Sequence, residues 1–96
     1  MSLIINTEKY IVIYNGKRIE LPLREFELML LLCKYPGKVY SRKQLFDELW
    51  GKNSTSKERT VDVHIARIRE KTDKELIKNI IGVGYKITTY AVVIEN

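Results

Sequence analysis

The segment 57–71 constrains what this chain can fold into more than any other stretch of the sequence. At about 100° of rotation per residue, a helix over this segment would carry Val61, Ile65 and Ile68 on one side. A single apolar stripe of this kind predicts a helix that is buried along the stripe and exposed elsewhere. The predicted exposed side is basic and polar, and it consists of Arg59, Thr60, Val63, His64, Arg67 and Lys71.

The chemistry of this exposed side fits nucleic acid. Arginine, lysine, threonine and histidine side chains bond phosphates and base edges, and an outward valine, Val63, suits a thymine methyl group. The whole chain of 96 residues is also basic, because 17 Lys and Arg against 12 Asp and Glu give a net charge of +5. The same side would suit a solvated helix without a partner equally well, so the neighbouring segments have to decide.

The residues ahead of the first helix have the pattern of a small antiparallel sheet. Segment 10–14 is rich in β-branched and aromatic residues, the Asn-Gly pair at 15–16 is a strong hairpin signal, and segment 17–21 alternates polar and apolar residues. Residues 3–5 predict an earlier strand, and Pro22 ends the sheet.

The apolar run 28–33 predicts a helix in the centre of the core. It begins near Leu23 and is stopped by the Pro-Gly pair at 36–37. Cys33, the only cysteine, lies on this helix and is expected to pack as a small buried apolar residue.

Capping signals bound the next two helices. Ser41, with Gln44 three residues on, forms a capping box at the start of one helix, and Gly51 is placed to end it in a left-handed conformation. Thr55 and Glu58 form a second capping box ahead of the basic helix. Two consecutive helices joined by a short loop, the second of them basic, have the pattern of a helix-turn-helix.

A β-hairpin is predicted after the basic helix. A strand near 78–81, the Gly-Val-Gly turn at 82–84 and a returning strand at 85–89 precede a last strand at 91–94. The order of elements predicts one α+β domain over residues 1–96, a winged helix-turn-helix. Its parts are an N-terminal antiparallel sheet (1–22), a core of three helices (23–72), and a C-terminal β-hairpin wing with a last strand (76–94).

The sequence lacks the residues of an enzyme or a cofactor site. His64 is the only histidine and has no partners for a metal or for a nucleophile. The Gly-X-Gly at 82–84 opens no helix, so it does not predict a nucleotide site. Asp62 is expected to have a structural role, holding Arg69 or Arg59. With no spanning apolar run, no leader pattern and a lone thiol, the chain is expected in the cytoplasm.

At this point the sequence resembles a known family, the effector domains of OmpR/PhoB-type two-component response regulators. The resemblance covers about residues 21–87. The motifs that carry it occur in order and spacing, and they are Leu21 with Glu25–Met29, Val39–Leu45, Leu49–Gly51, Arg59–Arg69 and Gly82–Tyr85.

This resemblance implies a four-stranded amino-terminal sheet, three helices and a wing that together bind promoter DNA in a sequence-specific way. The implied contacts from the recognition helix are Arg59, Thr60, Val63, His64, Arg67, Arg69 and Lys71. The implied contacts to the DNA backbone and from the wing are Arg42, Trp50, Tyr85 and Lys86.

The resemblance also implies partners besides DNA. Members usually bind direct repeats as a head-to-tail dimer and carry an amino-terminal receiver domain, to which nothing in this chain corresponds. We expect the chain to be an excised fragment or a standalone member of the family. The loop that in some members touches RNA polymerase corresponds to Lys52, Asn53, Ser54, Thr55, Ser56 and Lys57.

Three residues depart from the family pattern. Pro22 stands in place of a capping threonine, Ala66 in place of a longer polar residue, and Ile81 in place of a wing arginine that would favour a narrow A·T-rich minor groove. Ala66 and Ile81 keep a second interpretation open, a winged-helix module that binds protein instead of DNA.

Overall fold

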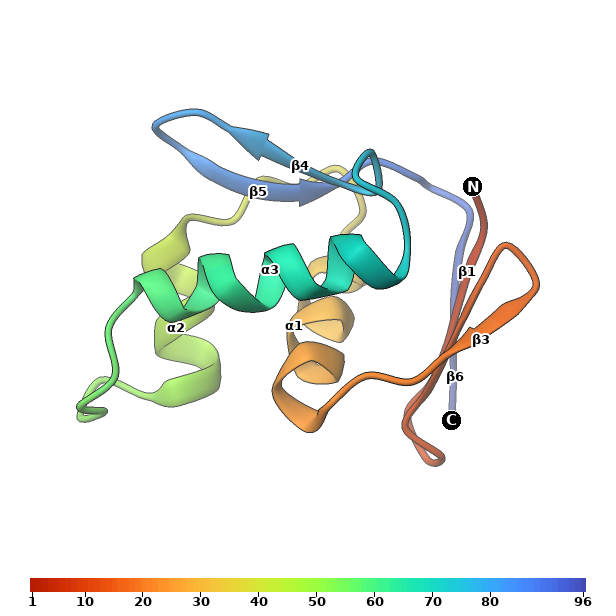
Figure 1. Ribbon diagram of the computed structural model, residues 1–96, viewed down its shortest axis with the longest axis horizontal. Helices are drawn as coiled ribbons and strands as arrows, with labels where there is room; N and C mark the ends of the chain where they lie inside the picture. The colour runs from red at the N-terminus through yellow and green to blue at the C-terminus, as the bar shows by residue number, and fades with distance from the viewer.

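A computed structural model describes residues 1–96 and places a four-stranded sheet at one end of the molecule (Figure 1). The strand order is β3-β2-β1-β6. The pairs β1–β2 and β2–β3 are antiparallel, whereas β1 and β6 run parallel. The strands are β1 (Leu3–Asn6), β2 (Ile11–Tyr14), β3 (Lys17–Ile19) and β6 (Val92–Glu95).

The parallel strand β6 corrects the prediction of a purely antiparallel, amino-terminal sheet. The implied four strands are present, but the fourth comes from the other end of the chain. The local sequence patterns predicted the strands and contained no signal for the pairing, because β1 and β6 are joined only through long-range contacts. The Asn-Gly hairpin is confirmed, since Asn15 (φ 50°) and Gly16 (φ 81°) both adopt the positive φ that a tight hairpin turn requires.

Three helices follow the first strands: α1 (Leu23–Lys34), α2 (Arg42–Trp50) and α3 (Arg59–Lys71). The capping box of α2 is confirmed, because the Gln44 amide donates to Ser41 Oγ at 3.0 Å and the Ser41 amide donates to Gln44 Oε1 at 2.8 Å. Gly51 ends α2 with a positive φ of 82°, but its ψ of 159° lies outside the left-handed helical region.

The second predicted capping box is wrong. The helix α3 begins at Arg59, its cap residue Glu58 has a helical backbone, and no side chain caps the helix. The first amides of α3 are satisfied locally instead, because Thr60 N–H donates to the Lys57 carbonyl and Val61 N–H to the Glu58 carbonyl. Thr55 therefore lies in the loop with no capping role.

The predicted wing is confirmed as a hairpin of β4 (Ile77–Ile80) and β5 (Gly84–Ile87) that lies alongside α3 (Figure 1). A bridge between Tyr40 and Tyr85 fastens it to the segment ahead of α2. At Gly84 a side chain would overlap the Tyr40 carbonyl oxygen, so this close approach requires glycine.

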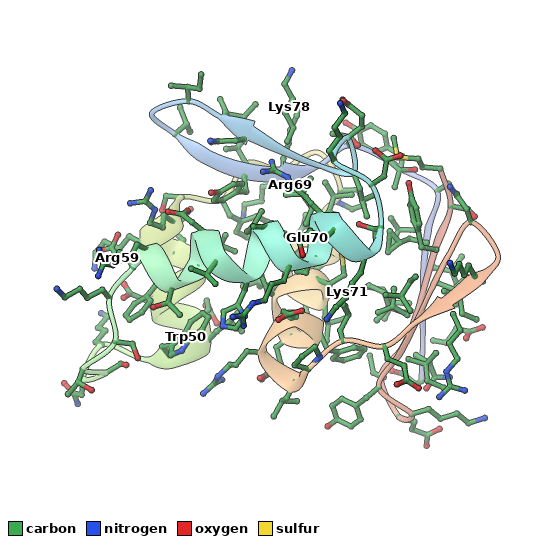
Figure 2. The ribbon with its side chains drawn as sticks, in the orientation of Figure 1. Trp50, Arg59, Arg69, Glu70, Lys71 and Lys78 are labelled. Carbon is green, nitrogen blue, oxygen red and sulfur yellow. The ribbon has the colours of Figure 1, made fainter.

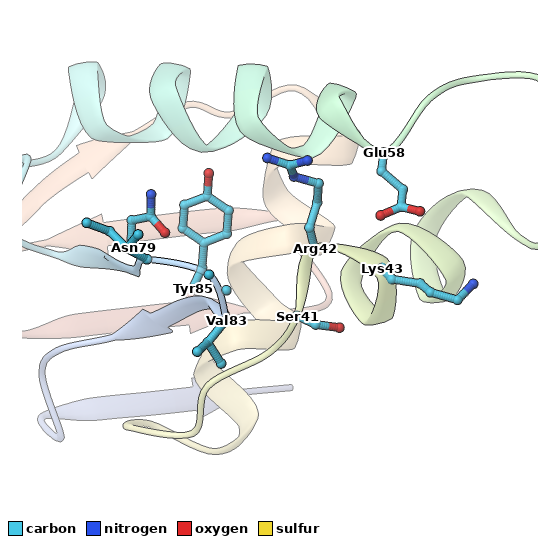
Figure 3. Close-up of a pocket in the computed structure, with 10 residues that line it drawn as sticks. Ser41, Arg42, Lys43, Glu58, Asn79, Val83 and Tyr85 are labelled. Atoms are coloured by element: carbon cyan, nitrogen blue, oxygen red, sulfur yellow. The ribbon is translucent and has the colours of Figure 1, made fainter.

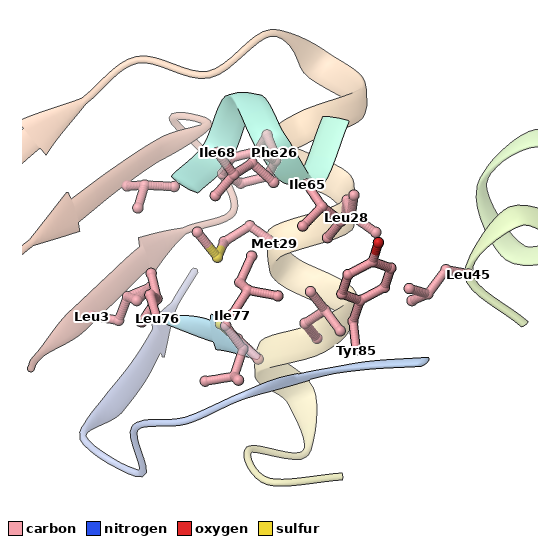
Figure 4. Packing of buried hydrophobic residues seen from close by; sticks show 14 of the residues in the cluster. Leu3, Phe26, Leu28, Met29, Leu45, Ile65, Ile68, Leu76, Ile77 and Tyr85 are labelled. Carbon is pink, nitrogen blue, oxygen red and sulfur yellow. The ribbon is translucent and has the colours of Figure 1, made fainter. Parts of the chain in front are cut away.

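The core surrounds α1, as the apolar run predicted. Phe26, Leu28 and Met29 of α1 are buried, and Ile65 and Ile68 of α3 pack against them (Figure 4). Residues from all the other layers join this cluster: Leu3, Leu45, Leu76, Ile77 and Tyr85. None of the three helices has the length and apolar character needed to span a membrane.

Candidate nucleic-acid interface

The helix α3 has a buried side and an exposed outer face. Val61, Ile65 and Ile68 are fully buried, as the helical periodicity predicted. Val63 is 47% exposed and the Arg67 side chain is 57% exposed, so both point away from the core. The exposed residues of this face are Arg59, Val63, Ala66, Arg67 and Glu70, and Figure 2 shows Arg59 and Glu70 on the accessible side of the helix.

One flank of α3 is occupied by a buried acid from α1. Glu25 is only 1% exposed, and its carboxylate faces three basic residues of α3. Lys71 Nζ lies 3.2 Å from Oε1, His64 Nδ1 lies 3.3 Å from Oε2, and Arg67 Nη1 lies 4.0 Å from Oε2. Pairing of this kind offsets the cost of removing a carboxylate from water.

The opposite flank of α3 packs against the wing through Asp62. The Tyr85 hydroxyl donates to Asp62 Oδ1 at 2.6 Å, and Arg42 Nη2 lies 2.8 Å from Oδ2. The structural role expected of Asp62 is therefore present, but its expected partners are wrong. Arg69 donates to the Ile77 carbonyl of β4 at 2.9 Å instead.

The environment of Tyr85 shifts its acidity. Burial, followed by its hydrogen bond to Asp62, raises the pKa of Tyr85 from 10.0 to about 12. Tyr85 is thus a buried support that joins the wing to α3, and its hydroxyl is not free to meet a ligand. Arg42 keeps half of its side chain exposed beside the same carboxylate.

Aromatic stacking joins α2 to α3. Trp50 stacks on Phe46 and on His64, with ring centroids 5.5 Å apart in each pair. The Arg24 guanidinium lies over the Trp50 ring at 5.4 Å. The His64 side chain is only 16% exposed between Trp50 and Glu25, so it is far less accessible than the sequence suggested.

The wing carries apolar residues at its tip. Ile81 is 91% exposed and Val83 is 57% exposed, whereas Lys86 is half-buried. A cavity of about 410 Å³ separates the wing turn from the start of α2, and Ser41, Arg42, Lys43, Val83 and Tyr85 are among the residues that line it (Figure 3).

The α2–α3 loop and Cys33 are not part of the exposed face of α3. The loop is exposed at Lys52, Asn53, Thr55, Ser56 and Lys57 and half-buried at Ser54. Burial raises the pKa of the Cys33 thiol to about 12, so the thiol stays protonated at neutral pH.

Two acidic residues that bear on the site were missed in the sequence. The first is Glu25, since an acid within the apolar first helix is a signal of a buried ionic contact. Glu70 lies on the exposed face of α3, where a carboxylate can accept a hydrogen bond from the amino group of cytosine. Helical spacing alone places Glu70 close to Val63 and Ala66.

A helix-turn-helix whose second helix is exposed along a basic face, with a hairpin beside it, defines the winged helix-turn-helix class. Residues 16–87 match the family model described as "Transcriptional regulatory protein, C terminal". The chain belongs to this family, whose members include response regulators of the OmpR/PhoB type.

Similar proteins agree with this membership. The chain is 43% identical over 86 residues to the uncharacterized transcriptional regulatory protein YclJ of Bacillus subtilis, covering 85% of this chain and 38% of YclJ. DrrB, an OmpR/PhoB homologue of Thermotoga maritima, is 39% identical with a TM-score of 0.77, covering 88% of this chain and 41% of DrrB. The Klebsiella pneumoniae RstA DNA-binding domain, solved in complex with the RstA box, is 27% identical with a TM-score of 0.80, covering 92% of each chain.

Proposed function

We propose that this domain binds duplex DNA in a sequence-specific way, as the output domain of a two-component response regulator that controls transcription. The observation that carries the proposal is the exposure of Val63 and Arg67 on a helix whose other side is fully buried. Such a helix can enter a major groove while the core holds it rigidly from behind.

The residues of α3 divide into two groups in this proposal. Arg59, Thr60, Val63 and Arg67 read bases or meet nearby phosphates, because arginine pairs with guanine and valine meets a thymine methyl. His64, Arg69 and Lys71 act close to the protein, since each side chain makes a hydrogen bond to another protein group, whereas Arg67 has only a 4.0 Å ion pair and stays 57% exposed. They hold the helix and reach at most the adjoining backbone phosphates.

Outside α3, we propose fewer DNA contacts, and these contacts go to phosphates instead of bases. Arg42 and Lys86 supply charge toward phosphates, while Trp50 and Tyr85 support the surface from beneath. The wing meets the neighbouring backbone without a minor-groove arginine, because Ile81 occupies its tip.

The partners follow from the same family membership and are proposals too. The chain spans only 38% of YclJ, so the full protein is proposed to carry a receiver domain ahead of this domain. Two copies are proposed to bind direct repeats head to tail, with the loop 52–57 available to RNA polymerase. The bacterial cytoplasm is the proposed location, because the DNA target lies there.

The alternative, a winged-helix module that binds protein, draws on the exposed apolar wing tip at Ile81 and Val83. Similarity to the RstA domain, which was solved in complex with the RstA box, supports the DNA-binding proposal over this alternative. No group of catalytic residues supports an enzyme.

Selection of bound duplexes from a random pool, followed by titration at several salt concentrations, tests the proposal. We expect a recovered consensus with half-sites about one helical turn of 10–10.5 bp apart. The logarithm of the binding constant should fall with log salt at a slope of about −0.9 per phosphate neutralised. A pool without consensus and without any duplex binding at low salt would leave the protein-binding alternative.

A further inference from the structure

The buried carboxylate of Glu25 is the ionic group that the proposed function does not use. It lies near the start of α1, is 1% exposed, and faces residues 64, 67 and 71 of the recognition helix. These residues are three and four positions apart, so they form one row along α3. One acid from α1 therefore meets three cationic or potentially cationic side chains of α3.

The contacts along this row differ in closeness. Lys71 and His64 lie at 3.2 Å and 3.3 Å, one on each carboxylate oxygen, and they fix the orientation of the carboxylate. Arg67 lies farther away, at 4.0 Å through Nη1, and its side chain remains 57% exposed. The guanidinium thus has one edge toward Glu25 and the rest toward solvent.

We propose that Glu25 is a positioning residue that determines specificity by orienting the Arg67 guanidinium for a base contact. This inference rests on the proposed DNA binding. Glu25 stays beside one edge of the guanidinium while the opposite edge faces the groove. A bidentate contact with guanine needs the planar group in one orientation, whereas a phosphate accepts many orientations. Orientation by Glu25 therefore favours the correct sequence over random DNA.

The test compares Glu25→Gln with wild type on the selected duplex and on a scrambled duplex. Glutamine keeps the shape of the side chain and removes the charge that attracts Arg67. We expect binding to the selected duplex to weaken about two- to fivefold, the usual range for one ion pair near a surface, and binding to the scrambled duplex to be unchanged. In an Arg67→Ala background, Glu25→Gln should have no further effect on the selected duplex.

Glu27→Gln is the matched control. Glu27 lies on the same helix and pairs with Arg24 at 3.3 Å, so its removal changes the net charge equally without touching α3. Any change that the control causes should be the same on both duplexes, and the effects of Glu25→Gln are measured relative to this control. Equal weakening on both duplexes by Glu25→Gln, no effect on either duplex, or an undiminished effect in the Arg67→Ala background would overturn the inference.

Further outcomes distinguish a failure of the inference from a loss of folding and from a failure of the proposed function. If Glu25→Gln does not fold, the crystal structure of the wild-type complex decides. Arg67 should remain beside Glu25 while it contacts a base, and a guanidinium turned away to a phosphate would refute the inference. If wild type shows no preference for any duplex, the proposed function fails. If wild type is selective and Glu25→Gln is equally selective, only the role of Glu25 fails.

Discussion

At the scale of single residues, two acids organise the recognition helix from both sides, the buried Glu25 and the half-buried Asp62. Glu25 faces the row of His64, Arg67 and Lys71, and Asp62 joins Arg42 and Tyr85 on the opposite flank. The sequence pattern predicts one free basic face, but several of its cationic side chains are paired with acids of the protein itself. The residues left free for DNA are fewer, and their orientation is better defined.

Tyr85→Phe tests the support beneath the wing. Loss of the hydrogen bond to the Asp62 carboxylate should lower the free energy of unfolding by about 1.5–3 kcal/mol in urea denaturation. Tyr90→Phe is the control, because Tyr90 is 77% exposed, and it should change stability by less than about 0.5 kcal/mol. Equal effects of the two substitutions would show that the Asp62 contact does not stabilise the domain.

The same residue gives stability a pH dependence. The folded state raises the pKa of Tyr85 from 10.0 to about 12, so the folded state keeps the proton more tightly than the unfolded state. Its contribution to stability is therefore complete below pH 10 and declines as the pH rises toward 12. The decline measured for wild type should become shallower in Tyr85→Phe.

At the scale of elements, the position of the wing depends on its contact with the segment ahead of α2. Gly84→Ala would force a methyl group into the Tyr40 carbonyl oxygen, and we expect the free energy of unfolding to fall by at least about 2 kcal/mol. Gly82→Ala, on the same turn, meets no neighbouring atom. It should cost only about 1 kcal/mol for its positive φ. Similar losses at both glycines would argue against the close packing of the wing.

The wing tip offers a test of its distance from DNA. Ile81 is 91% exposed, and Ile81→Arg would add a charge that can enter a narrow minor groove. Binding to sites with A·T-rich flanks should tighten by up to about 1 kcal/mol, with a smaller gain on G·C-rich flanks. Unchanged affinity on both kinds of flank would mean that the wing tip stays away from the groove.

Local signals explain why some elements were predictable. The stripe of Val61, Ile65 and Ile68 gives α3 its period and its buried side, and the Ser41–Gln44 pair encodes the start of α2. The cap predicted at Thr55 failed because backbone turns satisfy the first amides of α3. Local patterns thus determine helices well and their exact ends less well.

At the scale of the whole molecule, the contacts that could not be predicted are those between distant segments. The parallel pairing of β1 with β6 joins the two ends of the chain, and no local pattern specifies a partner strand. Glu25 meets Lys71 across 46 residues, so this contact depends on how α1 packs against α3. The residues of the candidate site could therefore be predicted from the sequence, whereas the contacts between them could be found only from the packed fold.

The whole arrangement presents one face of α3 to solvent and keeps the sheet at the other end of the molecule (Figure 1). Backbone amide chemical shifts of the domain, titrated with the duplex recovered by selection, test this division. We expect the largest changes at Arg59, Val63 and Arg67, smaller changes in the wing, and none in the strand β2. Large changes in the four-stranded sheet, with α3 unaffected, would contradict the proposal that this helix reads DNA.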